Sequence, residues 1–500
     1  MASWRCSGRG AEDLVTVDYH AILPELILAG TILLVLVVDL FLPARLKWGS
    51  MPIGLIGVLG SLVAVLTLLG DERATFGGAF VVDNFAILFK VFFLVAALIV
   101  LAVSRHYFDQ PGYYQGEYYF LLLTSFLGCL LMPSSRDLLM LFISLELVSA
   151  PGFLMAAFRK WTVTGVEGGL KFFLIGVLST AVMLFGMSLI YGLTGGKTRL
   201  DEIAGSLGQL DPSQEAMALA SILFVVVGFA FKVSAFPFQF WAPDTYEGAP
   251  VPVAAFLAVA SKAAGFAGLL QLMFVAFIGQ HEFWVPIFAF LAIATMTIGN
   301  LVALQQRQFV RLLAYSGIAQ AGYILLPFAL VTTDQGVNQQ AFASATAYIL
   351  IYGIMNLGAF AVAVALSKRS PRLLISDFAG VARVAPFLAV GMTLFMVSLA
   401  GVPPAAGFWA KILIFGAAIG RGEVLGPLLA AIMVVNSVVS VFYYLAIARQ
   451  MIFQPLEDTT PVRTPVLLAG VVGLSMAALL FFFLLPGTFS RLADISTLVA

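Results

Sequence analysis

Residues 228–266 read GFAFKVSAFPFQFWAPDTYEGAPVPVAAFLAVASKAAGF. The stretch holds the end of one apolar block, an interruption at Pro237, and the start of a second apolar block. Each block carries one lysine, Lys232 in the first and Lys262 in the second. Proline removes a backbone hydrogen bond, and in lipid the freed carbonyl must face protein or a water-filled cavity. The stretch therefore predicts a broken membrane helix with ionisable groups close to the break.

The rest of the chain has the same apolar character. Of its 500 residues, 61% are hydrophobic and 10% are charged, whereas soluble proteins carry about a quarter charged residues. Apolar blocks of about 18 residues or more are typical of membrane-spanning helices. We expect an all-α polytopic membrane protein, which excludes a soluble enzyme, a nucleic-acid binder and a disordered chain. About fourteen spans are predicted, over residues 21–43, 51–70, 84–104, 117–133, 136–157, 167–193, 216–238, 252–278, 283–304, 310–331, 341–366, 386–419, 424–447 and 464–486.

Cofactor binding by this chain is not expected. Cys6 and Cys129 are too few for a four-cysteine metal site or a disulfide framework. The histidines, His20, His106 and His281, lie near the ends of apolar blocks, whereas haem in a membrane needs axial ligands at its own depth. The formal net charge of zero gives no support for nucleic acid as a partner.

Basic residues predict the orientation. With the N-terminus as loop zero, 13 of the 26 lysines and arginines fall in odd-numbered loops and 8 in even-numbered loops and ends. The positive-inside rule places the odd loops in the cytoplasm and both termini outside. The remaining basic residues are lysines inside predicted spans: Lys90, Lys171, Lys232, Lys262 and Lys411.

Buried lysines are candidate functional groups, because a charge at the centre of a membrane helix costs roughly 2.5–3.5 kcal/mol. Lysine can lose its proton on burial, whereas arginine stays charged. Glu146, the acid deepest in a predicted span, is expected to pair with one lysine. Simpler interpretations stay open for two of them: Lys90 can extend to the surface, and Lys171 can form a helical pair with Glu167.

Prolines interrupt a second span in the same manner. Pro403 and Pro404 divide the predicted twelfth span before Lys411, much as Pro237 divides the seventh span after Lys232. Transporters place ion sites at broken helices in corresponding positions of two inverted halves. The offset of five spans gives the two halves opposite topology, so the pattern favours an inverted repeat.

Several longer motifs follow one another in a recognisable order. They are EGGLKFF at 167–173, YGLTG at 191–195, the stretch 228–266, RLLAYS at 311–316, LAGVPPAAGF at 399–408, and NS at 436–437 before YY at 443–444. Together they resemble the antiporter-like membrane subunits of the bacterial proton-pumping NADH–quinone oxidoreductase, respiratory complex I. The DTYEG motif at 244–248 and a lysine at 411 resemble subunit N among them. The similarity covers roughly residues 20–486.

The resemblance implies fourteen helices with two inverted five-helix repeats and broken helices seven and twelve. It divides the chain into an N-terminal extension at 1–20, helices one to three at 21–116, a first repeat at 117–278, a second repeat at 283–447, helix fourteen at 464–486 and a tail at 487–500.

The resemblance also implies a proton route. Glu146 would be the pairing acid and Lys171 or Lys232 its lysine partner, while Lys262 would be the central carrier and Lys411 the exit-side group. Pro237, Pro403 and Pro404 would hold the breaks. The family often has histidine where this chain has Gln239 and Gln320, and glutamine does not titrate near neutral pH. Transfer near Gln320 would then need water or Tyr323.

Partners follow from the same resemblance. NADH, flavin, iron–sulfur clusters and ubiquinone or menaquinone would bind to partner subunits, and this chain would contact sister antiporter-like subunits, small membrane subunits and lipid. The location implied is the bacterial inner, or plasma, membrane. Two alternatives stay open: a subunit of an Mrp-type Na⁺/H⁺ antiporter or membrane-bound hydrogenase, and a structural module whose lysines bind only neighbours or lipid.

Overall fold

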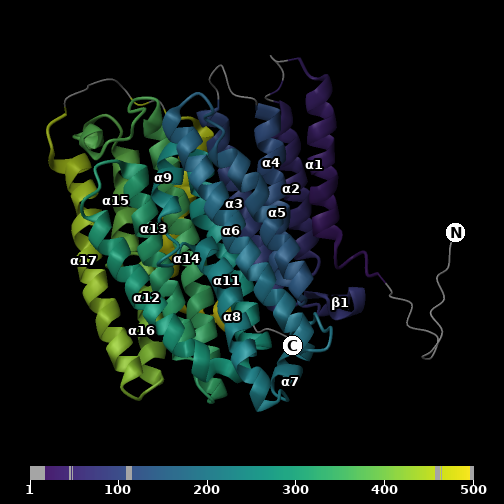
Figure 1. The fold of residues 1–500 in the computed structure, drawn as a ribbon. Coiled ribbons are helices and arrows are strands. Elements are labelled where there is room, and N and C mark those ends of the chain that lie inside the picture. The colour runs from purple at the N-terminus through teal and green to yellow at the C-terminus, as the bar shows by residue number, and fades with distance from the viewer. Residues whose placement is uncertain are drawn as a thin grey trace.

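The protein forms a bundle of helices that stand side by side (Figure 1). This computed structural model describes residues 17–43, 47, 49–108, 115–456, 462 and 464–495; most of the predicted extension and the end of the predicted tail lie outside them. The helices are α1 Leu23–Phe41, α2 Ser50–Leu66, α3 Asn84–Tyr107, α4 Gln115–Leu131, α5 Leu138–Ala156, α6 Val163–Leu193, α7 Leu200–Leu207, α8 Pro212–Val233, α9 Trp241–Gly248, α10 Val251–Phe256, α11 Lys262–Gln271, α12 His281–Ala303, α13 Phe309–Leu325, α14 Gln335–Ser367, α15 Pro386–Ala400, α16 Gly407–Gly420, α17 Leu425–Phe453, α18 Val466–Leu484 and α19 Pro486–Ile495.

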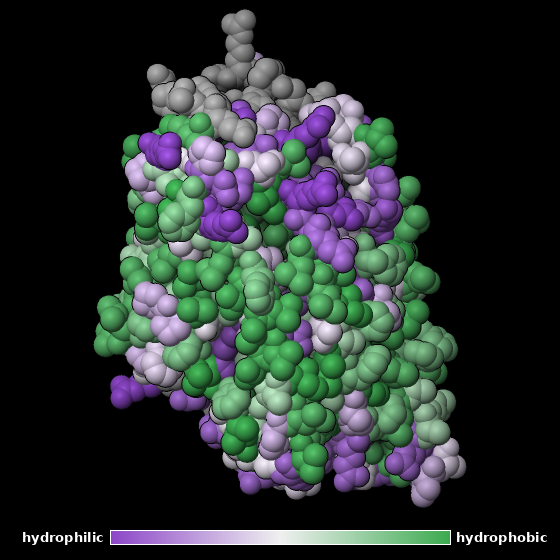
Figure 2. Space-filling model, turned by 90° about the vertical axis from the view of Figure 1, so that its left-hand side faces the viewer, coloured by the Kyte–Doolittle hydropathy of each residue, from purple (hydrophilic) through white to green (hydrophobic). Residues whose placement is uncertain are grey.

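The predicted membrane class is confirmed. Within the described ranges, 12 helices are long and apolar enough to cross a membrane. On the face shown in Figure 2, hydrophobic residues cover most of the middle of the molecule, and hydrophilic residues gather toward its two ends. The predicted span 51–70 is the 17-residue α2, and the predicted span 386–419 is divided between α15 and α16. The count of fourteen spans stays a prediction.

Both predicted breaks are present. After α8 the chain turns through Ser234 in the left-handed region (φ 60°), and Phe236-Pro237 is a cis peptide. After α15 it turns through Gly401 (φ 79°), and Pro403-Pro404 is cis. Glycine adopts this conformation without a steric penalty. Each break therefore follows directly from a left-handed residue and a nearby proline.

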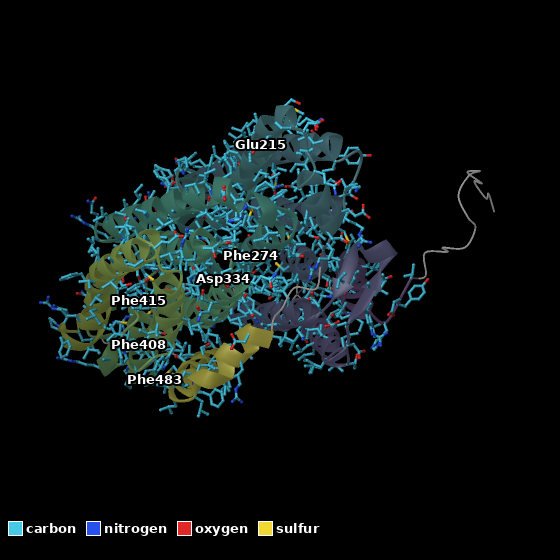
Figure 3. The ribbon with its side chains drawn as sticks, turned by 90° about the horizontal axis from the view of Figure 1, so that it is seen from below. Glu215, Phe274, Asp334, Phe408, Phe415 and Phe483 are labelled. Atoms are coloured by element: carbon cyan, nitrogen blue, oxygen red, sulfur yellow. The ribbon has the colours of Figure 1, made fainter. Side chains whose placement is uncertain are left out.

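Two elements at the centre of the bundle position the site. The segment Val251–Ala276 is buried apart from the partly exposed Phe274, and π-helical turns (η4, Leu257–Ser261, and η5, Leu272–Ala276) flank α11 within it. The other element is α14, which is buried over most of its 33 residues. Seen from below, Phe274 of η5 and Asp334 at the start of α14 lie near the middle of the molecule (Figure 3).

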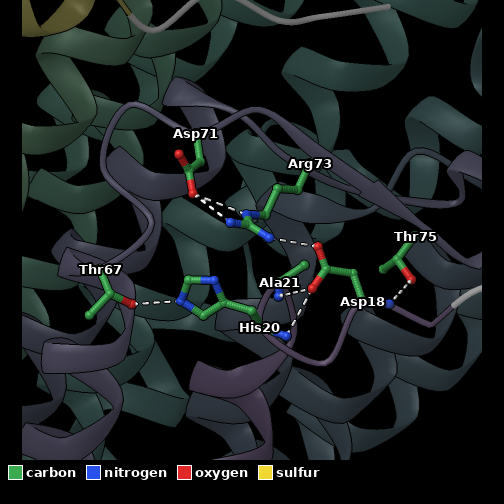
Figure 4. A network of polar contacts seen from close by, with 7 residues as sticks. All are labelled: Asp18, His20, Ala21, Thr67, Asp71, Arg73 and Thr75. Atoms are coloured by element: carbon green, nitrogen blue, oxygen red, sulfur yellow. Dashed lines mark hydrogen bonds and ion pairs between the residues drawn. The ribbon is translucent and has the colours of Figure 1, made fainter.

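A small hairpin marks one end of the bundle, which we call the outer end after the orientation that the basic residues predict. Strands β1 (Arg73–Thr75) and β2 (Phe80–Val82) pair antiparallel there. Arg73 donates to Asp18 at 2.9 Å, beside the start of α1 (Figure 4), and this bond holds the pKa of the Asp18 carboxyl below its ordinary value. We call the opposite end, where α3 ends and α6 begins, the inner end.

Candidate functional site

Lys232 lies at the end of α8, next to the first helix break. Its side chain is buried, and Nζ donates a hydrogen bond to Ser149 Oγ on α5 at 2.8 Å. Its stem packs against Gly265 on α11, where an added Cβ would lie 2.9 Å from Lys232 Cγ. Gly265 lies about one turn beyond Lys262. The two lysines therefore occupy neighbouring positions on facing helices.

Glu146 lies on α5 and is partly exposed on the surface of the isolated chain. Its carboxylate accepts a hydrogen bond from Thr180 Oγ1 on α6 at 2.9 Å. Residues three apart share one face of a helix, so Glu146 lies beside Ser149, the acceptor for Lys232. Among the described residues, Glu146 makes no direct ion pair with Lys232 or Lys171. Its pairing with a lysine stays a prediction.

Lys171 has different partners, because α9 returns past the inner part of α6. Its Nζ lies 2.6 Å from Glu167 and 2.6 Å from Asp244. Asp244 also accepts from Arg311 of α13 at 2.7 Å, and Arg311 reaches Glu247 at 2.9 Å. We call these five residues the α9 clamp. The simpler interpretation of Lys171, a pair with Glu167 on the same helix, is thus confirmed. Asp244 is a second acidic partner.

Asp244 and Arg311 were not among the predicted site residues. Burial raises the pKa of the Asp244 carboxyl, but hydrogen bonds from Lys171 and Arg311 more than offset this and hold it below its ordinary value of 3.8. A signal was present in the sequence, since both residues lie inside the motifs DTYEG and RLLAYS. Sequence spacing alone does not show that these motifs meet.

Lys262 is the most isolated cation of the site. It is buried at the start of α11, and its Nζ has no hydrogen-bond partner in the part of the chain that the structure describes. The ring of Tyr246 lies 6.0 Å from Nζ. A Cβ added at Gly317 would lie 3.2 Å from Lys262 Nζ and 2.9 Å from Tyr352 Oη. A small gap over Gly317 therefore separates the lysine from a tyrosine hydroxyl.

Polar groups continue from this gap toward the second break. Gln320 accepts from Tyr348 Oη at 2.5 Å and donates to Tyr444 Oη and to the carbonyl of Leu399, both at 3.1 Å. Ser316 and Tyr444 share a hydrogen bond of 2.5 Å. Gln320 thus connects α13, α14 and α17 at the position where the family often has histidine. Neither Tyr348 nor Tyr444 was among the predicted site residues, although Tyr444 belongs to the YY motif, because a tyrosine in an apolar span is more often a packing residue.

Lys411 lies on α16, behind the second break. Its Nζ donates to the carbonyl of Ala400 at 2.9 Å and lies 4.7 Å from the centre of the Tyr323 ring. A Cβ at Gly401 would lie 2.5 Å from Lys411 Cδ. The ammonium group therefore satisfies a carbonyl at the end of α15, in agreement with the requirement that backbone groups at a break find a partner.

A second polar branch lies beside Tyr323. Asn300 of α12 donates to Tyr323 Oη at 3.1 Å and to Asn436 Oδ1 at 3.2 Å, and it accepts from Tyr443 Oη at 2.9 Å. These residues are buried. The polar residues of the second half therefore form two adjoining networks around Lys411.

Lys90 does not extend to the surface as one interpretation expected. Its side chain is completely buried, 2.8 Å from Glu25 of α1, and its Nζ lies 4.7 Å from the Phe80 ring centre. The expectation of a single deep acid is therefore incomplete, since Glu25 is a second one. Glu25 was missed because it lies in the first turn of its helix, where an acid usually reaches water.

The arrangement can hold and transfer protons. The buried lysines of the site lie on α8, α11 and α16, and hydroxyl and amide groups lie between the lysine of α11 and the lysine of α16. Such groups donate and accept at once, and buried polar atoms without a partner commonly bind ordered water. The breaks contain the predicted residues Pro237, Pro403 and Pro404. Gln320 donates to the carbonyl of Leu399 just before the second break, and the ring of Tyr323 lies beside the Lys411 ammonium.

Known proteins share this sequence and fold. The family model described as NADH:quinone oxidoreductase/Mrp antiporter, transmembrane, matches residues 135–440. NADH-quinone oxidoreductase subunit N of Trichlorobacter lovleyi is 41% identical over 91% of this chain and 93% of its own length. NAD(P)H-quinone oxidoreductase subunit 2 of Synechococcus elongatus is 40% identical over 88% of this chain and 83% of its own.

Solved structures agree. A chain of respiratory complex I from Thermus thermophilus with bound Aureothin is 31% identical, with a TM-score of 0.78 over 94% of this chain and 99% of that one. A chain of the Mrp complex from Dietzia sp. DQ12-45-1b is 20% identical with a TM-score of 0.82, over 96% of this chain and 97% of that one. This second likeness concerns the fold alone.

Proposed function

Because this chain belongs to the NADH:quinone oxidoreductase/Mrp antiporter membrane family, we propose that it translocates protons as subunit N of a bacterial NADH–quinone oxidoreductase. It would lie in the plasma membrane with both termini outside. Sister antiporter-like subunits, small membrane subunits and lipid would surround it. NADH, flavin, iron–sulfur clusters and quinone would bind to partner subunits, which would carry out the redox chemistry.

One observation supports the proposal above the others. Lys262 is buried and has no hydrogen-bond partner among the described residues. It lies between Lys232, which packs on the same helix at Gly265, and the Tyr352 hydroxyl, which lies across the gap over Gly317. An ammonium ion in such a place is costly unless water or a neighbouring group stabilises it. No side chain among the described residues fixes a proton on this nitrogen by accepting a hydrogen bond from it. This is the property that a transient proton carrier needs.

The route would begin at Lys232 on α8. Lys232 donates to Ser149 of α5, the helix that also carries Glu146. A change in the distance of Glu146 alters the stability of the charge on Lys232, so a conformational signal from the partner subunits would release its proton toward Lys262. The proton would then cross the gap at Gly317, follow the hydroxyl and amide groups around Gln320, and reach Lys411 on the exit side. Ordered water would complete the contacts that the side chains leave open.

The test uses the assembled complex in proteoliposomes, where protons moved and NADH oxidised are measured together. We expect Lys262→Ala and Lys411→Ala to lower the number of protons moved per NADH oxidised. Lys197→Ala is the matched control, since Lys197 is exposed in the connection between α6 and α7. An unchanged ratio in both variants of an assembled complex would contradict the proposal.

The same vesicles distinguish the antiporter alternative. Proton uptake driven by an imposed Na⁺ gradient, with no NADH present, would support Na⁺/H⁺ exchange instead. We expect no such uptake, and we expect the proton ratio to be the same in Na⁺ and in K⁺ buffers.

A further inference from the structure

A large cavity opens between helices at the inner end. Its volume is about 800 Å³, and it lies between the end of α3, the start of α6, the α9–α10 connection, the start of α13 and the end of α14. Charged residues around it are Arg159, Glu247, Lys368 and Arg372. None of the buried lysines of the proton route lines it.

The charges around this cavity do not balance. Arg159, Lys368 and Arg372 are cations, while the single lining carboxylate, Glu247, already pairs with Arg311 at 2.9 Å. Nε of Arg159 is buried without a hydrogen-bond partner in the described part of the chain. Like charges that share a cavity repel one another, and a buried donor without an acceptor is costly. Both features favour an anion in this space.

The remaining lining is apolar. Val251, Val310 and Leu373 contribute to the same wall as the cations. The cavity lies where α3 and α14 end, which is the level at which membrane helices meet lipid headgroups. A soluble polyphosphate would gain nothing from the apolar part of the wall, whereas an amphiphile matches both parts.

We propose that this cavity binds the phosphate headgroup of an anionic phospholipid from the leaflet at the inner end. Basic pockets between transmembrane helices are suited to such headgroups. The two guanidinium groups would bind phosphate oxygens in pairs, and the ammonium of Lys368 would act as a point charge. The glycerol and first methylene groups would contact the valines and Leu373.

The site would lie close to the proton route. Tyr246 lines the cavity, and its ring lies 6.0 Å from Lys262 Nζ. A bound phosphate would therefore be separated from the central lysine by a single aromatic side chain. The binding proposal does not depend on this proximity and can fail or succeed independently of proton translocation.

The experiment measures lipids retained by the purified complex. The complex is stripped of lipid in detergent, incubated with phosphatidylglycerol or phosphatidylcholine, and examined by native mass spectrometry. The test variant is R159Q/K368Q/R372Q. The matched control is R307Q/R383Q/R449Q, which removes three exposed arginines at the same end of the bundle that do not line the cavity.

We expect the wild type and the control to bind phosphatidylglycerol in preference to phosphatidylcholine. The test variant should lose roughly a hundredfold in phosphatidylglycerol affinity, because each cation near an anionic headgroup contributes about fivefold. The single variant Lys368→Gln should lose about fivefold, which keeps the test decisive if the triple variant does not assemble.

Three results would overturn the proposal. One is equal loss in the test and control variants, which would indicate a general surface effect. Another is unchanged phosphatidylglycerol binding in the test variant and in Lys368→Gln. The third is displacement of the lipid by millimolar inorganic phosphate, which would assign the site to a soluble anion.

Discussion

The buried lysines differ in what accepts their hydrogen bonds. Lys232 donates to a serine hydroxyl and Lys411 to a backbone carbonyl, and both acceptors are uncharged. Lys90 faces a carboxylate, so its charge is compensated directly. Lys262 has none of these acceptors within the described residues. Lysines with the same sequence signal therefore have different electrostatic environments and, we infer, different roles.

The gap over Gly317 gives the first prediction. In Gly317→Ala the new methyl group would displace the Lys262 ammonium and the Tyr352 hydroxyl. We expect the rate of proton transfer in proteoliposomes to fall roughly tenfold. This corresponds to a transfer barrier that is higher by about 1.4 kcal/mol. Stability should fall by about 1–3 kcal/mol, because the site is buried and the added methyl group overpacks it. The higher helix propensity of alanine offsets part of this loss.

Gly416→Ala is the control for this variant, since Gly416 is also helical and nothing lies within 4 Å of an added Cβ. Equal proton transfer in Gly317→Ala and wild type would show that the gap is not on the route.

The Glu25–Lys90 pair gives a prediction about stability. Lys90→Met would leave the Glu25 carboxylate buried without its cation, and breaking one side of a buried pair costs about 3–5 kcal/mol. The double variant Glu25→Leu/Lys90→Met should recover most of this loss. Thermal unfolding of the detergent-solubilised complex measures the loss of stability in the single variant and its recovery in the double variant. A single variant as stable as the double one would mean that the carboxylate is already neutral.

At the scale of elements, the second break depends on one residue. Gly401 combines a φ of 79° with close contact to the Lys411 stem. Gly401→Ala should therefore cost about 1–3 kcal/mol in backbone strain and also displace the ammonium from the Ala400 carbonyl. We expect both lower thermal stability and fewer protons moved per NADH oxidised.

Gly422→Ala separates these two effects. Gly422 has a similar φ of 68°, but nothing lies within 4 Å of its added Cβ. It should lose similar stability and keep its proton ratio. If both variants keep the ratio, the position of Lys411 against the break does not matter for transfer.

The α9 clamp gives a prediction with a defined pH dependence. Its cations lower the pKa of Asp244, so the clamp stabilises the protein fully above the unfolded-state pKa and loses this effect as pH falls through the lower, folded-state value. Asp244→Asn should therefore reduce the melting temperature at pH 7, with a smaller difference from wild type near pH 3. Asp211→Asn is the control, because Asp211 is exposed. A difference that does not change with pH would contradict the charge-based account.

Much of this organisation could be predicted at the element scale. Apolar length identified the 12 helices that are long and apolar enough to cross a membrane in the described ranges. Pro237, Pro403 and Pro404 identified the breaks, because both signals are local. The β1–β2 hairpin and α7 were not predicted, since three-residue strands and an eight-residue helix leave too short a pattern. The second acidic partner of Lys171 was not predicted, because Asp244 is distant along the chain and reaches Lys171 only through the return of α9.

At the scale of the whole molecule, the central lysine and the glutamine of the polar network lie on elements that other helices surround. Phe274 and Asp334 mark the centre in the view from below, while Glu215 and Phe483 lie at opposite rims (Figure 3). Lys262 and Gln320 belong to central helices, whereas α1, α6 and α17 present apolar side chains outward. The fold thus surrounds its polar path with apolar helices, which excludes bulk water from the sides.

The orientation of the whole molecule can be tested with thiol labelling. Lys197→Cys lies toward the outer end, and Arg307→Cys lies toward the inner end. Each new cysteine is placed in a variant of the protein that lacks Cys6 and Cys129. When a membrane-impermeant maleimide is added outside the cells, it should label Lys197→Cys and leave Arg307→Cys unlabelled. The reverse pattern would place both termini in the cytoplasm.

The glutamine at position 320 has a consequence for where a proton can rest. Neither its amide nor the hydroxyls of Tyr348 and Tyr444 around it take up a proton near neutral pH. Such a chain can pass a proton along but cannot store one. At any instant the charge would reside at Lys262 or at Lys411, and the interval between them would be a crossing without a stopping place. A histidine would instead provide a halfway station whose occupancy varies with pH around 6.5.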